Sequence, residues 1–273
     1  MIFDPSAINP VAIHIGFMNI RWYGVIIASG LVLGTLMAAF IARQMKENPE
    51  HAWNIVTYGA VVAIICARLY YVAFTWDVYS KHPEDIIAIW KGGLAIHGGI
   101  LGGIAFVLIY THLNKLSNLL WLDICAFGII LGQAIGRWGN FINQEAFGGP
   151  NPDGIFKLFV SQIYRPVEYS SEMYFHPTFF YESMWDIGVL GIMIFIFFKY
   201  KDKLKAGTFL AIYGILYPMG RFWVEGLRTD SLMLTPYLKQ AQVFSAVLIL
   251  ISIIMLVLIY RDKFMKNKPA SNP

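Results

Sequence analysis

Long apolar segments separated by short polar stretches make up most of this 273-residue chain. A helix needs about 20 mostly apolar residues to cross a bilayer, and seven segments approach that length. Lipid offers no partners to backbone N–H and C=O groups, so we expect each segment to be a helix. The predicted fold class is all-α, a polytopic membrane helix bundle of about seven transmembrane helices. The expected spans are Trp22–Ala42, Trp53–Phe74, Leu94–Tyr110, Leu119–Gly136, Thr178–Phe198, Gly207–Gly220 and Val243–Tyr260.

Lysine and arginine are divided unevenly between the loops on the two sides of these spans. Short cytoplasmic loops carry an excess of both residues. The poorer set begins with a tail that has no Lys or Arg before Arg21, and its next loop mixes lysines with acidic residues. The N-terminus is therefore predicted outside and the C-terminus in the cytoplasm. The residues assigned to the cytoplasmic side are Arg43, Lys46, Lys115, Lys199, Lys201, Lys203, Lys205, Arg261, Lys263, Lys266 and Lys268.

One long loop interrupts what we expect to be a single integral membrane domain over residues 1–273. Residues 140–177 separate the fourth and fifth expected spans, on the side predicted to face outward. Within them, the stretch GGPNPDG at 148–154 is a strong turn signal. We therefore predict a small exoplasmic loop subdomain, or lid, inserted between the two spans.

Composition supports a membrane protein and argues against several other classes. Apolar residues make up 57% of the chain and charged residues 14%, whereas soluble domains carry about 25% charged residues. The net charge of +4 arises from lysines in short loops, so we predict no nucleic-acid partner. The sequence has no clustered Cys/His spacing, no P-loop and no Gly-x-Ser-x-Gly turn, so we predict no metal, no cofactor and no serine nucleophile.

Polar side chains gather at the span ends that the charge pattern places outside. Ionisable groups at membrane depth are costly and usually serve a function. An arginine at a span end can also reach toward headgroups, and an Arg–Glu pair spaced i,i+4 can be an ordinary helix contact. The outward set comprises Arg21, Tyr23, Arg68, His97, Arg137, Asn140, His176, Tyr181, Glu182, Asp186, Arg221, Glu225 and Arg228.

The basic residues of this set are almost all arginine, which points to a phosphate ligand. The planar guanidinium binds phosphate through two parallel hydrogen bonds and keeps its charge, whereas lysine acts as a point charge. Contacts with headgroups alone would populate both faces and would not favour arginine over lysine. We therefore expect a binding site for a phospholipid headgroup on the outer side.

The stretch GRWGNFINQE at 136–145, followed by Gly148, resembles the signature of the prolipoprotein diacylglyceryl transferase family. Four shorter pieces stand in that family's order: RWYG at 21–24, HGG at 97–99, HPT at 176–178 with Tyr181 and Glu182, and RFWVE at 221–225. The resemblance spans most of the chain. It implies a multi-pass enzyme of the bacterial cytoplasmic (inner) membrane, with its active site toward the exoplasmic (periplasmic) face.

Such an enzyme has two membrane-borne partners, phosphatidylglycerol and a prolipoprotein signal peptide with its lipobox. It transfers the diacylglyceryl group of the lipid to the lipobox cysteine, forms a thioether and releases glycerol phosphate. This reaction is the first step of bacterial lipoprotein maturation.

Two chemical demands of that reaction assign roles to the candidate residues. The thiol, with an ordinary pKa of about 8.5, must lose its proton, and the departing phosphate gains negative charge. Arg137 and Arg221 are the expected clamp on the phosphate, His97 is the expected base, and Tyr23 is a catalytic candidate that binds phosphate or a glycerol hydroxyl. The field of the arginines is an alternative source of the thiolate. The remaining predicted substrate-binding residues are Asn140, Asn143, Glu145, Gly148, Glu225, Arg21, Arg68 and Glu182.

Within that set, we expect Glu145 and Glu225 to hold the two arginines, and Asn140 to bond the headgroup or the backbone. Three other functions remain open at this point. A phospholipid transporter or flippase that binds anionic headgroups at the outer face also needs intramembrane charge, but favours midplane sites and internal repeats, and no repeat is evident. A non-catalytic scaffold leaves the arginines unexplained. A phosphatidyltransferase typically needs an Asp-rich metal site, which the sequence lacks.

Overall fold

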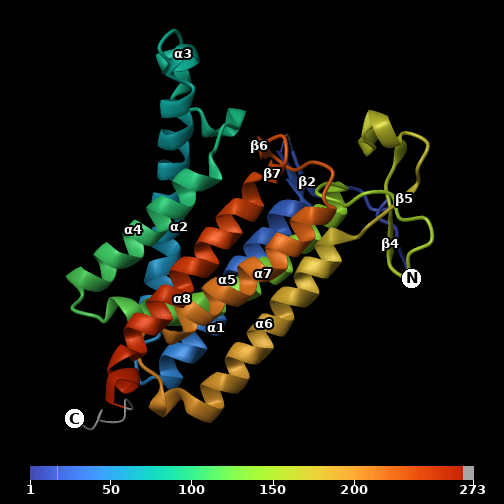
Figure 1. The fold of residues 1–273 in the computed structure, drawn as a ribbon. Helices are drawn as coiled ribbons and strands as arrows, with labels where there is room; N and C mark the ends of the chain where they lie inside the picture. The colour runs from blue at the N-terminus through green and yellow to red at the C-terminus, as the bar shows by residue number, and fades with distance from the viewer. Residues whose placement is uncertain (17, 267–273) are drawn as a thin grey trace. The chain divides into compact units, whose positions relative to one another are not determined.

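The computed structural model describes residues 1–16 and 18–266 and is largely helical (Figure 1). Lys268, assigned above to the cytoplasmic side, lies outside the described residues. A long helix matches each predicted span to within two residues at its start or extends beyond it, and short strands and single turns connect these helices. The long helices are α1 Trp22–Gln44, α2 Glu50–Phe74, α4 Ile96–Leu113, α5 Asn118–Asn143, α6 Thr178–Tyr200, α7 Thr208–Leu227 and α8 Gln240–Lys266.

Six helices in the described part of the chain are long and apolar enough to cross a membrane: α1, α2, α4, α5, α6 with the turn after it, and α8. The predicted multi-pass membrane helix bundle is therefore confirmed. Helix α7 covers the sixth expected span, but it runs on past Gly220 to Leu227 and contains Pro218, which cannot donate a backbone hydrogen bond. A seventh span and the orientation of the termini stay predictions.

The chain divides into two compact units, which are described separately. Residues 38–125 form one unit, in which α2 and α4 lie side by side (Figure 1). Glycine permits this close packing, because a Cβ atom at Gly98 would lie 2.5 Å from the carbonyl oxygen of Cys66. The connection between the two helices contains α3 Trp76–Tyr79 and the single turns η1 Pro83–Asp85 and η2 Ile89–Lys91.

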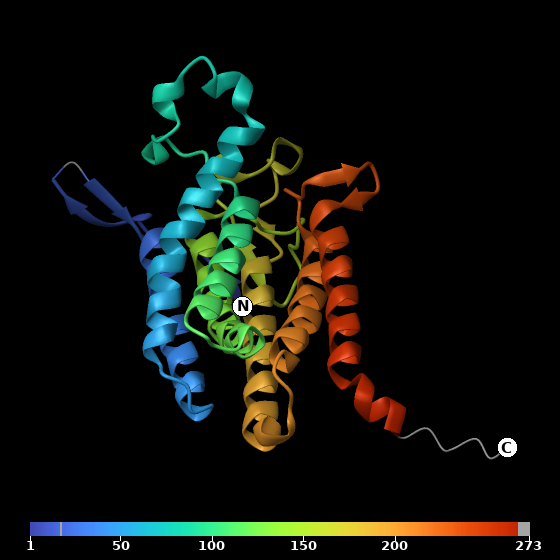
Figure 2. The same ribbon diagram turned by 90° about the vertical axis from the view of Figure 1, so that its left-hand side faces the viewer.

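Residues 1–37 and 126 onward form the other unit, in which α6, α7 and α8 pack in sequence order (Figure 2). Helices α1 and α5 approach each other through glycines, and a Cβ atom at Gly34 would lie 2.6 Å from the carbonyl oxygen of Gly128. Two hairpins flank the helices: β2 Val11–Ile15 with β3 Met18–Arg21 before α1, and β6 Met233–Thr235 with β7 Leu238–Lys239 before α8.

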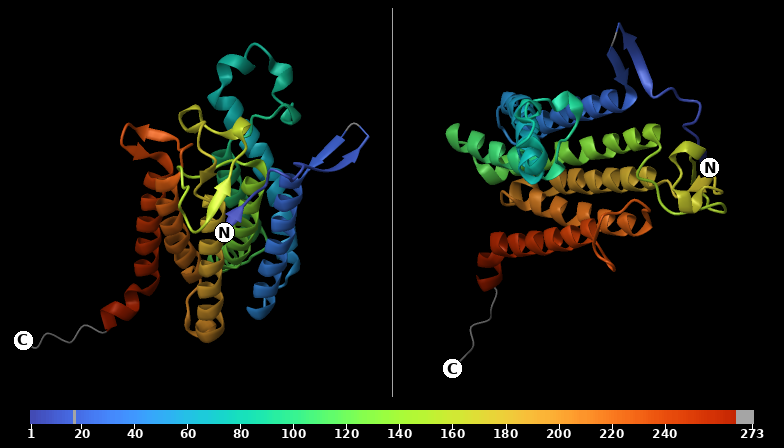
Figure 3. Two further views of the ribbon diagram at one scale, coloured as in Figure 1. Left: turned by 90° about the vertical axis from the view of Figure 1, so that its right-hand side faces the viewer. Right: turned by 90° about the horizontal axis from the view of Figure 1, so that it is seen from above.

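A small sheet joins the N-terminus to the 140–177 loop. Strand β1 Ile2–Phe3 pairs in parallel with β4 Lys157–Phe159, which pairs antiparallel with β5 Tyr174–Phe175 (Figure 3). The terminal ammonium donates a 2.6 Å hydrogen bond to the carbonyl oxygen of Ile155. The loop also contains η3 Gln162–Tyr164 and η4 Val167–Tyr169. Buried side chains of the strands and of neighbouring segments form one hydrophobic cluster: Phe3, Phe147, Leu158, Val160, Phe175 and Phe179.

Candidate functional site

Four charged side chains from three helices form a connected group, here called the arginine cluster: Arg137, Glu182, Arg221 and Glu225. Arg137 of α5 pairs through Nε with Oε2 of Glu182 on α6. Arg221 of α7 donates from Nη1 to Oε1 of the same Glu182 at 2.5 Å. Its Nη2 lies 2.5 Å from Oε2 of Glu225, the i,i+4 pair expected from the sequence. Glu182 therefore bridges the two arginines.

The carboxylates of the cluster are more buried than its guanidinium groups. The side chains of Glu182 and Glu225 are 6% and 3% exposed, whereas those of Arg137 and Arg221 are 20% and 19% exposed. Oε2 of each glutamate forms an ion pair without a well-aligned hydrogen bond. Buried charges are tolerated when they are paired, so the carboxylates fix the arginines from behind. The arginines retain an accessible side that can receive an anion.

Two tyrosines extend the polar face of α7 below Arg221. Tyr213, Tyr217, Arg221 and Glu225 follow one another at four-residue intervals, which places them on one side of the helix. The two tyrosine rings stack with centroids 5.4 Å apart, and the hydroxyl of Tyr213 donates to Oε1 of Gln133 at 3.1 Å. Sequence reasoning missed both tyrosines, although their spacing from Arg221 was a usable signal.

The turn that ends α5 orders the other polar residues of the signature. Glu145 accepts hydrogen bonds from Nδ2 of Asn140 at 2.9 Å and from Nδ2 of Asn143 at 3.2 Å. Gln144 and Ala146 have positive φ angles of 53° and 58°, which are uncommon for residues other than glycine. Glu145 thus holds the two asparagines, and the carboxylate paired with Arg137 is Glu182.

Glycines of the same stretch bring further candidates close to the backbone. A Cβ atom at Gly139 would lie 2.7 Å from Cδ2 of Tyr23, so the ring of Tyr23 packs against this turn of α5. A Cβ atom at Gly148 would lie 2.7 Å from Cβ of His176 and 3.0 Å from the carbonyl oxygen of Leu227. Gly148 therefore lets the loop, the start of α6 and the end of α7 meet.

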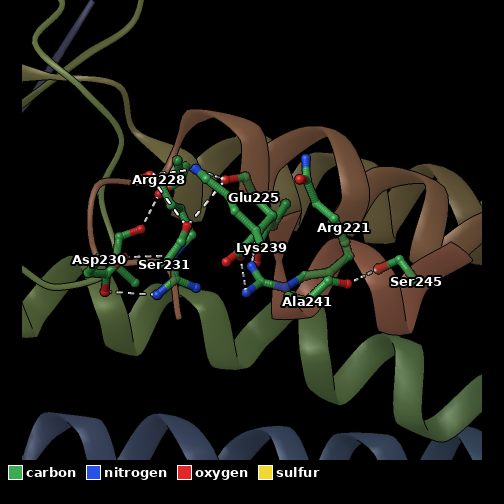
Figure 4. Close-up of polar contacts among 12 residues, drawn as sticks. Arg221, Glu225, Arg228, Asp230, Ser231, Lys239, Ala241 and Ser245 are labelled. Carbon is green, nitrogen blue, oxygen red and sulfur yellow. Dashed lines mark hydrogen bonds and ion pairs between the residues drawn. The ribbon is translucent and has the colours of Figure 1, made fainter. Parts of the chain in front are cut away.

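The segment after α7 holds its cations in fixed contacts (Figure 4). Arg228 donates from Nε and Nη2 to the two carboxylate oxygens of Asp230, both at 2.9 Å. Burial alone raises the pKa of Asp230, but the hydrogen bond and charge of Arg228 outweigh it and lower that pKa. Lys239 donates to the carbonyl oxygens of Glu225 at 2.7 Å and Arg228 at 3.0 Å. It therefore caps the C-terminus of α7 and fixes the end that carries Arg221.

His176 lies just before α6, beside the arginine-bearing helices. Its Nδ1 is 3.4 Å from the hydroxyl of Tyr181. Partial burial lowers the pKa of His176, which favours the neutral imidazole at neutral pH. Arg21 lies at the end of β3, opposite Val11, and is exposed. Substrate binding by Arg21 stays a prediction.

Arg68 and His97 belong to the unit of residues 38–125. Arg68 is 5% exposed and donates to four backbone carbonyl oxygens, those of Asp85, Ile86, Gly92 and Gly93, at 2.6 to 2.8 Å. His97 is exposed in the first turn of α4, with its ring centroid 6.2 Å from that of Tyr70. Their predicted roles toward a substrate stay predictions.

Comparison with known proteins gives a family for this arrangement. The model of the prolipoprotein diacylglyceryl transferase family matches residues 10–258. A protein of Acaryochloris marina named phosphatidylglycerol–prolipoprotein diacylglyceryl transferase is 48% identical over 239 residues, which cover 88% of this chain and 86% of the relative. Proteins of the same name in Synechocystis and Bacillus velezensis are 44% identical over 264 residues and 43% identical over 257 residues. They cover 96% and 92% of this chain, and this chain covers 92% of each.

Proposed function

The chain belongs to the prolipoprotein diacylglyceryl transferase family, and we propose that it transfers the diacylglyceryl group of phosphatidylglycerol to the lipobox cysteine of prolipoproteins. The cysteine sulfur forms a bond to the carbon of the diacylglyceryl unit that carries the phosphate, and the bond between this carbon and the phosphate oxygen breaks. The thiol proton leaves, and glycerol phosphate departs with the electron pair of the broken bond. The product is a thioether-linked diacylglyceryl cysteine.

The observation that carries this proposal is the bridge from Arg137 through Glu182 to Arg221. The departing phosphate gains negative charge as the carbon–oxygen bond breaks, so fixed guanidinium groups bind it more tightly in the transition state than in the ground state. Loss of one such fixed donor costs about 2.7–4 kcal/mol of barrier. Because Glu182 and Glu225 hold the arginines before substrate arrives, the clamp needs little reorganisation.

The remaining candidates serve the lipid and the thiol. Tyr23 packs on Gly139 near the end of α5. In this position its hydroxyl binds the phosphate or a glycerol hydroxyl. Asn140, oriented by Glu145, offers an amide to the headgroup. His97 accepts the thiol proton, because an imidazole is the side chain best suited to proton transfer near neutral pH.

We place this reaction at the exoplasmic face of the bacterial inner membrane. The lysine-rich ends of the spans support a cytoplasmic location for the opposite face. Both substrates then reach the arginine cluster from within the membrane.

The test uses the purified full chain in vesicles that contain phosphatidylglycerol, with a lipobox peptide and a matched peptide in which serine replaces the cysteine. Mass spectrometry should show a mass gain of one diacylglyceryl group on the cysteine peptide alone, with release of glycerol phosphate. Vesicles of phosphatidylethanolamine serve as the lipid control. Movement of a labelled phosphatidylglycerol between leaflets without any peptide adduct would overturn the proposal in favour of a transporter.

A further inference from the structure

A pocket of about 220 Å³ lies between α1, α5 and α6, and two of its lining residues, Trp138 and Ser183, are the chain neighbours of Arg137 and Glu182. Ile26 and Ser29 of α1 form one wall, Leu131 and Trp138 of α5 form another, and Ser183 and Ile187 of α6 form the third. All three helices are apolar enough to cross a membrane. The pocket therefore lies within the apolar part of the protein.

The polar atoms in the walls are engaged by the protein itself. The indole N–H of Trp138 donates to Oγ of Ser183 at 3.1 Å, and that hydroxyl donates to the carbonyl oxygen of Ala134 at 2.9 Å. Oγ of Ser29 donates to the carbonyl oxygen of Val25 at 2.8 Å. With these groups paired, the walls offer mainly hydrocarbon contacts. Such a lining suits an alkyl chain better than a hydrogen-bonding ligand.

The two ends of the pocket differ in character. At one end the lining residues are Trp138 and Ser183. In the sequence they come directly after Arg137 and Glu182, which form an ion pair. Toward the other end, α1 and α5 close on each other, since a Cβ atom at Gly30 would lie 3.2 Å from the carbonyl oxygen of Gly132. From Leu131 to Trp138 the pocket follows about 10 Å of helix. The apolar pocket is partly open, and the ion pair of Arg137 and Glu182 lies one residue before Trp138 and Ser183 on α5 and α6, an arrangement that matches an anionic lipid.

We propose that this pocket holds the part of one acyl chain that lies next to the glycerol of the phospholipid, and that Ser29 and Ile187 determine how bulky that chain can be. The inference rests on the proposed function. The surrounding lipid is as apolar as the pocket, so apolarity alone gives no preference between them. Selection comes from shape, because an oversized group in a packed space forces unfavourable contacts.

The test is a competition between two lipid substrates of different chain width. Vesicles contain equal amounts of phosphatidylglycerol with straight saturated chains and phosphatidylglycerol with methyl-branched phytanoyl chains, together with the lipobox peptide. The modified peptide carries the selected chains, so mass spectrometry gives the ratio of branched to straight product. Within one reaction this ratio does not depend on how much protein is folded.

Three variants test the walls and their surroundings. Ile187→Ala widens the pocket and should raise the ratio of branched to straight product at least threefold over the unchanged protein. Ser29→Phe narrows it and should lower the ratio by a similar factor. Leu33→Phe is the control, because Leu33 is also exposed on α1, one turn from Ser29, but does not line the pocket. It should leave the ratio unchanged.

An equal ratio in Ile187→Ala and the unchanged protein would overturn the acyl pocket, even if Ser29→Phe fails to fold. In that case the modified peptide would still show that the transfer reaction occurs. Absence of any modified peptide with the unchanged protein would instead refute the proposed function. A shift of the same size in Leu33→Phe would show that a bulky residue anywhere on the exposed face of α1 changes the choice of lipid. This result would also overturn the inference.

Discussion

Arg68 and Arg137 are both largely shielded arginines of apolar helices, but their partners differ in kind. Arg68 directs its nitrogen atoms at four backbone carbonyl oxygens in the connection between α2 and α4 and lies over the ring of Tyr79. Arg137 pairs with a carboxylate that it shares with Arg221, and its side chain remains 20% exposed. Arg68 therefore serves the fold through its backbone contacts, whereas part of the side chain of Arg137 remains accessible.

This difference shows what makes a buried arginine available to a ligand. Carbonyl oxygens carry no net charge, so they satisfy the hydrogen bonds of Arg68 and fix a loop without preparing an anion site. Carboxylates neutralise Arg137 and Arg221 and hold them at a set distance, and each arginine has donors left for a phosphate. The comparison predicts that substitutions in the cluster affect the chemical step, and that substitution of Arg68 affects the fold.

The largest expected effect is that of Arg137→Lys, which keeps the charge and removes the planar fork. We expect the rate of lipid transfer to fall by about 10²- to 10³-fold, because a fixed donor to the departing phosphate is lost. Thermal unfolding in detergent should change little. Arg165→Lys is the control, since Arg165 donates to carbonyl oxygens in the 140–177 loop, as Arg68 does in its own unit. Full activity of Arg137→Lys would show that Arg137 does not bind the departing phosphate as proposed.

The next effect is that of His97→Gln, which tests the proposed role of His97 as the base. A histidine base must be neutral to accept the thiol proton, so the rate of the unchanged enzyme should fall as pH decreases. In the variant we expect about a 10²-fold lower kcat and loss of this acid limb from the pH–rate profile. His112→Gln, at the other end of α4, is the control. If the variant keeps kcat and the fall in rate at low pH, His97 is not the base. The positive charges of Arg137 and Arg221 would then be the source of the thiolate.

A smaller effect separates the two glutamates near Arg137. Glu182→Gln removes the charge that joins both arginines and should lower kcat/KM by between about tenfold and 10²-fold, because the donors lose their set positions. Glu145→Gln should lower it less, since Glu145 is exposed and its structural contacts are with Asn140 and Asn143. Steady-state kinetics of both variants over a range of phosphatidylglycerol concentrations measures the difference. The reverse order would identify Glu145 as the group that holds the clamp.

These two glutamates also show the limit of what could be predicted from the sequence. Glu145 lies eight positions after Arg137 along the chain, so it was the natural candidate for its partner. Helix α5, however, ends at Asn143, and the turn with positive φ at Gln144 orients Glu145 toward the asparagines. The partner is Glu182, on a different helix. Local sequence distance carries no information about such a contact between helices.

The helices were predictable because the bilayer imposes their length and leaves them no other hydrogen-bonded form. Helix α7 continues seven residues beyond Gly220, and these turns carry Arg221 and Glu225 among apolar residues such as Phe222. The sheet of β1, β4 and β5 was not predicted. It joins Met1 to a segment 154 residues away, and two- or three-residue strands leave no pattern of alternating polarity. Contacts across the fold, rather than local preference, create it.

The smallest expected effect on the transfer rate is that of Arg68→Met, which tests the other side of the comparison. Methionine keeps the apolar stem but leaves the carbonyl oxygens of Asp85, Ile86, Gly92 and Gly93 without their donor. The free energy of unfolding should fall by on the order of 3 kcal/mol. Limited proteolysis should cut within residues 75–95 more readily than in the unchanged protein.

For folded Arg68→Met protein, separated from aggregates by size-exclusion chromatography, KM for phosphatidylglycerol should stay within about threefold of the unchanged value, because four of the five N–H groups of Arg68 are bonded to backbone carbonyl oxygens. Arg137→Lys measured in the same way provides the contrast, with normal unfolding and a large loss of rate. A tenfold rise in KM for Arg68→Met without any change in unfolding would show that this arginine also binds the lipid. The distinction between an arginine bound by carbonyl oxygens and one shared by carboxylates would then fail.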